Sequence, residues 1–196
     1  MCSSMKDTMT LDRRSGLPDA LKVLLDEHPR DLWESDANFD GLTRFWLSRH
    51  MLFRDLLARM TEDAAALADQ RTEAAPRNLG FVGRLGQALV TELHGHHRIE
   101  DLHYFPRLAG LEPRLERGFD ILDADHQALD GQLHELATAT NRVLRAEPIA
   151  LAGKAAALHD NLTGFAGFLD RHLIDEEDLV VPVILTHGAA LEGGPV

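Results

Sequence analysis

The sequence predicts an all-α protein, folded as an antiparallel up-down-up-down four-helix bundle with a short N-terminal helical arm. Four long stretches repeat apolar residues every three or four positions, which is the period of an amphipathic helix. Breaks that contain Pro or Gly separate these stretches, and such short connections favour antiparallel neighbours. The sequence contains neither the alternating pattern of a strand nor an internal repeat of the solenoid type.

The arm is expected to form one short helix from Leu17 to His28, because its leucines follow helical spacing and Pro18 suits a first helical turn. Residues 1–16 are expected to be a disordered leader. The expected domain organisation has three parts: a leader and arm over 1–39, the bundle over 40–188, and a flexible tail over 189–196.

The first long helix is expected to begin near Asp40, an acceptable N-cap, and to carry His50 on or beside its apolar stripe. The second is expected to begin near Asn78 and to end near Leu108–Gly110. Pro106 lies inside its last turns and should bend or loosen them, because proline cannot donate a helical hydrogen bond.

The third long helix is expected to begin near Pro113, and the fourth runs from near Pro148 to Gly188. On the third helix His126 shares a face with several leucines, so it is predicted to point inward. On the fourth helix His172 lies among apolar residues and is predicted to do the same.

Composition argues against several classes of function. Lys and Arg number 20 against 32 Asp and Glu, and the net charge of −12 argues against a nucleic-acid surface, which needs a basic patch. The first residues lack the apolar run of a signal peptide, and no stretch of ~20 apolar residues could span a bilayer. Cys2 is the single cysteine, so a thiolate metal site is not expected. We therefore expect a cytoplasmic protein with no nucleic-acid or membrane partner.

The stretch from His94 to Pro106 concentrates metal-ligating side chains. In a helix each residue advances ~100° around the axis, so His96, Glu100 and His103 fall within an arc of about 60°. His97 and Asp101 form a second pair, which is rotated by ~100° and is expected to lie off that face.

Each predicted helix carries an inward histidine at a matching height. Facing helices of a bundle are the usual place for a dinuclear carboxylate–histidine centre, and ligands without thiolate suit iron, manganese or zinc. The candidate metal ligands are His50, His96 with Glu100 and His103, His126, and His172 with Glu176 or Glu177.

The other histidines favour ordinary interpretations. His94, His97 and His134 are expected to be solvated or to support a ligand, whereas His28, His159 and His187 are expected to be incidental. By itself the acidic run from Asp175 to Asp178 favours a solvated face, but the preceding His172 favours a ligand set.

These residues resemble the motifs of the hemerythrin-like proteins, with their HHE cation-binding domain. The family pattern His-x-x-x-Glu-acid, followed by aromatic/aliphatic-Phe-Pro, is met from His96 to Pro106. An acid-His pair is met by Asp125 and His126, and His-Leu-x-x-acid-Glu with a later apolar-apolar-Pro is met from His172 to Pro182. His50 matches the first-helix histidine, and the resemblance covers about residues 40–186.

The resemblance implies a non-haem di-iron centre, with zinc or manganese as possible substitutes. It implies that Glu100 and Glu177 bridge the two ions. Regular helix geometry favours Glu176 instead, because Glu177 lies ~140° around the axis from His172. A π-type turn would reconcile the two, so Glu177 is predicted, with Glu176 as the alternative.

One departure from the family concerns the third helix. The family's oxygen carriers have two histidines one turn apart there, and Leu122 stands at the earlier position. The end of the second helix and the start of the third are neighbours in an antiparallel bundle, so we predict that His103 fills this vacancy. One metal then takes His50 and His96, and the other takes His103, His126 and His172.

The function implied by the resemblance is reversible binding of O₂, for sensing, storage or buffering. A peroxide or another small diatomic ligand is an alternative partner. The Leu122 substitution and the Glu100-x-x-His103 spacing also favour an enzyme, namely a di-iron oxidase, a peroxidase or a protein that handles nitric oxide. A third alternative is a signalling module whose metal is a sensor or a structural element.

Overall fold

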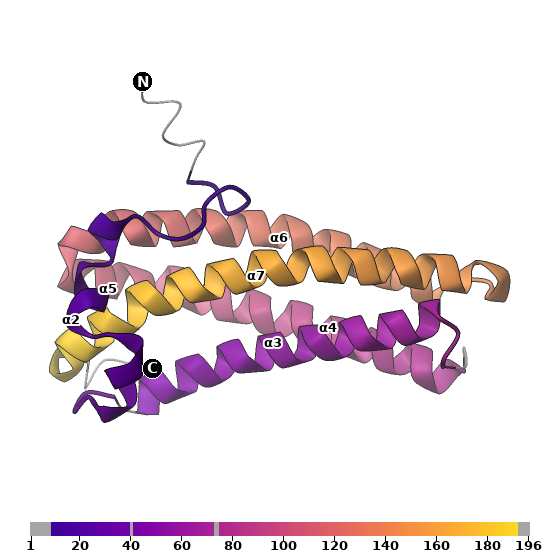
Figure 1. The fold of residues 1–196 in the computed structure, drawn as a ribbon, viewed down its shortest axis with the longest axis horizontal. Coiled ribbons are helices and arrows are strands. Elements are labelled where there is room, and N and C mark those ends of the chain that lie inside the picture. Colours follow the sequence, from indigo (N-terminus) through magenta and orange to yellow (C-terminus); the bar gives the residue numbers. More distant parts are fainter. Residues whose placement is uncertain (1–8, 40, 73–74, 192–196) are drawn as a thin grey trace, which may run out of the picture. The chain divides into compact units, whose positions relative to one another are not determined.

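The computed structural model describes residues 9–39, 41–72 and 75–191, and every regular element in these ranges is a helix (Figure 1). The all-α prediction is therefore confirmed for this part of the chain. The antiparallel order of the four long helices and the three-part domain division stay predictions. Asp40, Cys2, the first half of the expected leader and the end of the expected tail lie outside the described residues.

The long helices are α3 (Gly41–Ala68), α4 (Pro76–Ile99), α6 (Glu116–Leu144) and α7 (Pro148–Leu191). None of the described helices is long and apolar enough to cross a membrane. The arm contains η1 (Asp19–Leu21), α2 (Val23–Glu27) and η2 (Arg30–Ser35) in place of the single expected helix. Lys22 separates η1 from α2 because its backbone leaves the helical conformation.

The second expected helix changes its winding before Pro106. Helix α4 continues into η3 (Glu100–Tyr104), a π-helical turn, and then into α5 (Phe105–Leu111) and η4 (Pro113–Leu115). Pro106 is one of the first two residues of α5, where a missing backbone N–H is tolerated. The irregularity expected at Pro106 thus lies about one turn earlier in the sequence, and it is the π-helical turn η3.

The fourth helix extends beyond its expected end at Gly188. The backbone leaves the helical conformation at His187, with φ −116° and ψ 16°, and helical turns then continue to Leu191. Pro182 lies inside this helix without ending it.

The chain groups into two compact units. Unit 1 comprises residues 1–50, 98–126 and 171–196, and unit 2 comprises residues 51–97 and 127–170. In unit 2, Gly86 on α4 allows a close approach, because an added Cβ would lie 3.1 Å from Met60 Cε and 3.2 Å from Thr140 Cγ2.

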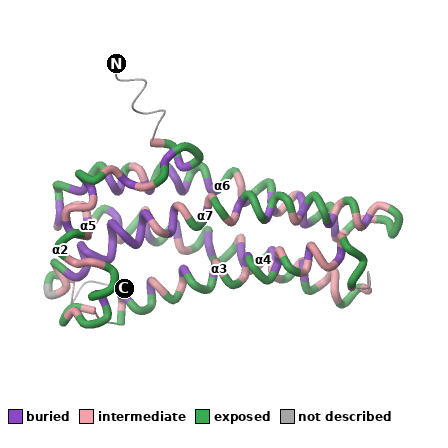
Figure 2. The backbone as a smooth tube through the Cα atoms, in the orientation of Figure 1, coloured by how far each residue is buried: buried purple, intermediate pink, exposed green. Residues whose placement is uncertain are grey.

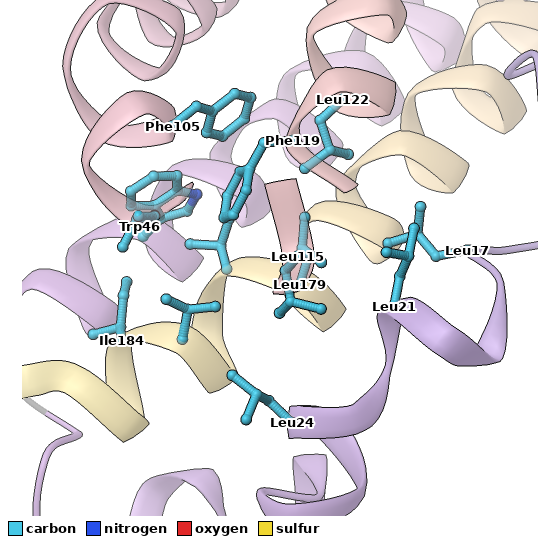
Figure 3. Close-up of a cluster of buried hydrophobic side chains, with 13 residues drawn as sticks. Leu17, Leu21, Leu24, Trp46, Phe105, Leu115, Phe119, Leu122, Leu179 and Ile184 are labelled. Atoms are coloured by element: carbon cyan, nitrogen blue, oxygen red, sulfur yellow. The ribbon is translucent and has the colours of Figure 1, made fainter. Parts of the chain in front are cut away.

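The core of unit 1 joins the arm to the helices that follow. Leu17, Leu21 and Leu24 belong to the same buried apolar cluster as Trp46 and Phe119 (Figure 3). Burial of a leucine side chain stabilises a fold by about 1.5–3 kcal/mol, so three buried leucines hold the arm against unit 1. The arm is therefore part of the folded core of this unit.

We expect Gly118→Ala to lower the free energy of unfolding by about 1–2 kcal/mol, because overpacking outweighs the gain in helix propensity. An added Cβ at Gly118 would lie 2.8 Å from both methyl carbons of the buried Leu179. Gly131, on the same helix α6, is the matched control, since an added Cβ there meets no described atom within 4 Å. Urea denaturation should show Gly131→Ala unchanged or stabilised. A stabilised Gly118→Ala would contradict the packing around Leu179.

Candidate metal centre

The acidic run on α7 is buried in unit 1. Asp175, Glu176, Glu177 and Asp178 all have buried side chains, and Figure 2 shows buried backbone along this part of α7. The run is therefore not a solvated acidic face. Carboxylates are rarely buried without a hydrogen-bond partner or a counter-charge, so the partners of this run define the site.

Three buried imidazoles meet the acids of unit 1. His50 on α3, His126 on α6 and His172 on α7 are each at most 3% exposed. The Nε2 atoms of His50 and His172 lie 3.5 Å and 3.4 Å from Glu176 Oε2. The Nε2 atom of His126 lies 3.7 Å from Glu100 Oε2. Two carboxylates thus face the Nε2 side of all three rings.

The opposite ring nitrogen of each imidazole faces another carboxylate. An Nδ1–H donor to a carboxylate fixes the tautomer and leaves the Nε2 lone pair for a metal. The Nδ1–oxygen pairs are His50 with Glu177 Oε1 at 3.0 Å, His126 with Asp101 Oδ1 at 2.7 Å, and His172 with Asp125 Oδ2 at 3.4 Å.

The donor set of unit 1 fits a metal ion. Ligand atoms of His50, Glu100 and Glu176 all lie within 4.8 Å of one another. Two atoms that each lie about 2.1 Å from one ion, at an angle of about 90–110°, are about 3.0–3.4 Å apart. The distances from Glu176 Oε2 to the two imidazole Nε2 atoms, 3.4 Å and 3.5 Å, are close to this separation.

The electrostatics of Glu100 also favour a cation. Its side chain is 1% exposed, and burial, followed by the charge of and hydrogen bond with Glu176, raises its pKa well above the ordinary value. Two adjacent buried carboxylates destabilise each other when both are ionised. A bound cation removes this repulsion.

His172 is a protonated imidazole in the metal-free protein at neutral pH. Burial lowers its pKa, but hydrogen bonds and charge interactions with Asp125 and Glu176 outweigh burial and raise the pKa to about 9. A metal ion that binds this ring displaces the proton.

Two arginines from the N-terminal segment donate hydrogen bonds to these acids. Arg14 Nη1 donates to Asp125 Oδ1 at 2.7 Å, and Arg14 Nε donates to Asp175 Oδ2 at 2.8 Å. Arg30 Nη1 donates to Glu177 Oε2 at 2.8 Å. Burial would raise the pKa of Asp125, but hydrogen bonds from Arg14 and His172 outweigh burial and lower it.

The named charges of the site do not cancel. The carboxylates outnumber the three guanidinium groups of Arg14, Arg30 and Arg171. A bound cation would reduce this excess of negative charge. The carboxylates are Glu100, Asp101, Asp125, Asp175, Glu176, Glu177 and Asp178.

An aromatic pair adjoins the centre. Trp46 Nε1 donates to Glu176 Oε1 at 2.8 Å, which fixes the carboxylate between two imidazoles. The ring of Tyr104 lies edge-on to that of Trp46, with centroids 4.8 Å apart. Tyr104 has a raised pKa, because burial and the charge of Glu100 disfavour its ionised form.

Unit 1 brings together five of the seven predicted ligands, namely His50, Glu100, His126, His172 and Glu177. His103 is exposed, so the structure does not support it as a ligand. Glu176, the alternative, lies on the Nε2 side of the rings, whereas Glu177 contacts His50 Nδ1 and Arg30.

The remaining histidines of the motif belong to unit 2. His96 is half-buried, and its ring centroid lies 5.1 Å from that of Phe53. His97 is 3% exposed, so a solvated His97 is contradicted. His94 and His134 are exposed, as expected, and His94 lies 3.2 Å from Asp130.

Sequence reasoning missed the arginines of the arm. Arg14 falls in the segment expected to be a disordered leader, and its contacts to Asp125 and Asp175 span 111 and 161 positions. Neither Arg14 nor Arg30 belongs to a periodic pattern or to one of the motifs.

Residues 41–184 match the hemerythrin family, described as the Hemerythrin HHE cation binding domain. The matched region contains every imidazole and carboxylate of the centre, and it excludes Arg14 and Arg30. No curated protein and no solved structure matches the chain.

We expect a paramagnetic metal ion to quench Trp46 fluorescence, because its indole donates to Glu176. Trp33 is the other tryptophan, and its indole donates instead to the His28 carbonyl at 2.7 Å. Titration of the metal-free protein with Co²⁺ should quench Trp33→Phe, which retains Trp46, far more than Trp46→Phe. Equal quenching of the two variants would contradict a metal at Glu176.

Proposed function

The chain belongs to the hemerythrin HHE cation-binding domain family, and from this premise we propose that it holds two iron ions and binds O₂ reversibly. The observation that carries the proposal is the two-sided arrangement of three buried imidazoles. Each ring faces Glu100 or Glu176 with Nε2 and a further carboxylate with Nδ1.

We propose Glu100 and Glu176 as the carboxylates shared by the two ions. Glu176 faces two imidazoles and accepts a hydrogen bond from Trp46. Glu177 is assigned to the support of His50, because Arg30 and His50 Nδ1 already occupy its two oxygens.

The first ion is assigned to His50 and His96. His96 precedes Glu100 by about one helical turn of a continuous helical segment, and residues four apart in a helix share a face.

The second ion is assigned to His97, His126 and His172, and His103 is withdrawn because it is exposed. His97 is buried, and it precedes Asp101 by four positions in one helical segment. Asp101 accepts from His126 Nδ1, which supports His97 and His126 as ligands of one ion.

A non-haem di-iron centre, once loaded, supplies reversible binding of O₂ or of another small diatomic ligand. The residues beside His126 are suited to excluding water from this side. Phe105 stacks on the His126 ring, with centroids 5.4 Å apart and planes at 22°. Leu122, which stands where the family's oxygen carriers have a ligand, is fully buried in the same apolar cluster as Phe105 (Figure 3). An apolar wall favours binding without turnover, since proton delivery needs polar groups or water.

A second candidate function is that of a di-iron oxidase or peroxidase. Trp46 and Tyr104 favour it, because these oxidisable rings contact each other and the indole donates to Glu176. Their position would allow electrons to reach the centre.

The deciding experiment is metal analysis with optical spectroscopy of the anaerobically reduced protein, before and after O₂ is added. Two irons per chain, and a visible band that disappears on deoxygenation, are expected. Rapid irreversible oxidation of two irons would favour the enzyme. Fewer than two metal ions per chain would contradict the dinuclear centre.

The variants Glu176→Gln and Glu177→Gln test the choice between the two carboxylates. Glu176→Gln should lower the metal content below two ions per chain, because it removes a shared ligand. Glu177→Gln should retain two ions with an affinity lower by about 10–100-fold, the usual effect of losing a hydrogen-bond partner of a ligand. Metal content after dialysis measures both. The reverse order would restore Glu177 as the bridging residue.

A further inference from the structure

We propose that Arg14 and Arg30 of the N-terminal arm are positioning residues of the metal centre. Each guanidinium fixes a carboxylate, and that carboxylate orients one ligand imidazole. This inference rests on the proposed metal-binding function and extends the centre to residues outside the matched family domain.

Of the two arginines, Arg14 is the more buried and holds its carboxylate more tightly. Its side chain is 1% exposed, and its fork contacts both oxygens of Asp125, with Nη2 on Oδ2 and Nη1 on Oδ1. Asp125 Oδ2 in turn faces His172 Nδ1 at 3.4 Å. A bidentate guanidinium fixes the plane of a carboxylate as well as its position. Arg14 therefore determines where Asp125 presents its acceptor to His172.

Arg14 also spans two helices. Its Nε donates to Asp175 on α7, while its terminal nitrogens contact Asp125 on α6. Asp175 is held a second time by Arg171 Nη2 at 3.0 Å. Without Arg14, Asp175 would thus keep only one contact with a guanidinium, that of Arg171, and Asp125 would lose both of its contacts with the Arg14 guanidinium.

Arg30 is linked to His50 in the same way, through a carboxylate that lies between them. Its Nη1 donates to Glu177 Oε2 at 2.8 Å, and the other oxygen of Glu177 lies 3.0 Å from His50 Nδ1. Its Nε donates to Asp178 at 2.7 Å, and its Nη2 donates to the carbonyl of Ile174 at 3.0 Å. The Arg30 side chain is 42% exposed, so water can replace part of its effect.

The arm is also fixed at two residues that follow Arg14 closely in the sequence. The backbone N–H of Leu17 donates to Asp175 Oδ1 at 3.2 Å, and Arg171 Nη1 donates to the carbonyl of Ser15 at 2.7 Å. Figure 1 shows this segment of the arm, in indigo, alongside α6. Arg14 is thus held in place by neighbours that do not contact an imidazole.

Removal of Arg14 should weaken metal binding, although it removes a positive charge. Without the fork, the plane and position of the Asp125 carboxylate are no longer fixed. Asp125 then no longer holds His172 Nδ1 in the orientation that the metal needs. Loss of such a hydrogen-bond partner usually lowers metal affinity by about 10–100-fold.

The test is a Co²⁺ titration of the full-length metal-free protein, followed by optical absorption, with Co²⁺ as the only metal present. Arg14→Met should weaken binding by about 10–100-fold. Arg30→Met should weaken it less, by about threefold to tenfold, because the exposed pair contributes less. Arg14→Lys should recover part of the loss, since it keeps the charge without the fork.

Arg13→Met is the matched control. It lies next to Arg14, and its side chain is 56% exposed beside Asp12. We expect its Co²⁺ affinity to equal that of the wild type. Thermal unfolding of each metal-free variant identifies those that fold as the wild type does.

A double-mutant cycle separates positioning from a general structural role. If Arg14 acts through Asp125, adding Arg14→Met to Asp125→Asn should change the Co²⁺ affinity no further. Asp125→Asn also removes the uncompensated carboxylate, so the double variant remains measurable if Arg14→Met alone fails to fold. Additive effects of the two substitutions would overturn the inference.

Two further outcomes differ in what they contradict. If the wild type binds two Co²⁺ ions and folded Arg14→Met and Arg30→Met bind them as tightly, the positioning role is wrong and the dinuclear centre stands. If the wild type itself binds fewer than two Co²⁺ ions, the proposed function is contradicted.

Discussion

Four consecutive acidic side chains, Asp175 to Asp178, are buried on α7, and their need for partners explains most of the polar structure of unit 1. A buried charge is tolerated only when it is paired and hydrogen-bonded. The acids of this run receive different partners, which are arginines from the arm, the indole of Trp46 and imidazoles. The arm and the long helices are therefore held together by one set of charges.

The spacing of residues in α7 brings these buried side chains together in pairs. Arg171 and Asp175 are four apart, as are His172 and Glu176, and both pairs are in contact. One turn of α7 thus places the His172–Glu176 pair beside the Arg171–Asp175 pair. Because Asp175 also accepts from Arg14, this turn of α7 contacts a segment about 160 residues away in sequence.

The periodic parts of this arrangement were predictable, and the irregular parts were not. His50, His126 and His172 are inward because they follow the apolar stripe of their helices, and Glu176 follows from i,i+4 spacing. The prediction for His103 assumed α-helical spacing, but residues 100–104 form the π turn η3. A π-helix has more residues per turn than an α-helix, so His103 is rotated less far around the axis from Glu100 and does not reach the same face. Of the two expectations for His97, solvated or supporting a ligand, burial contradicts the solvated one.

Arginine keeps the charge of the two supporting groups of the arm, Arg14 and Arg30, constant over the physiological pH range. A guanidinium stays protonated throughout the physiological range, whereas a histidine or a buried lysine would titrate. The contacts of these arginines with Asp125 and Glu177 therefore persist while the imidazoles exchange protons for metal. The centre is then larger than the domain that its motifs define, because the match begins at residue 41 while the charges that hold two of its imidazoles begin at residues 14 and 30. A sequence that retained only the matched domain would keep the imidazoles and carboxylates of the centre and would lose Arg14 and Arg30.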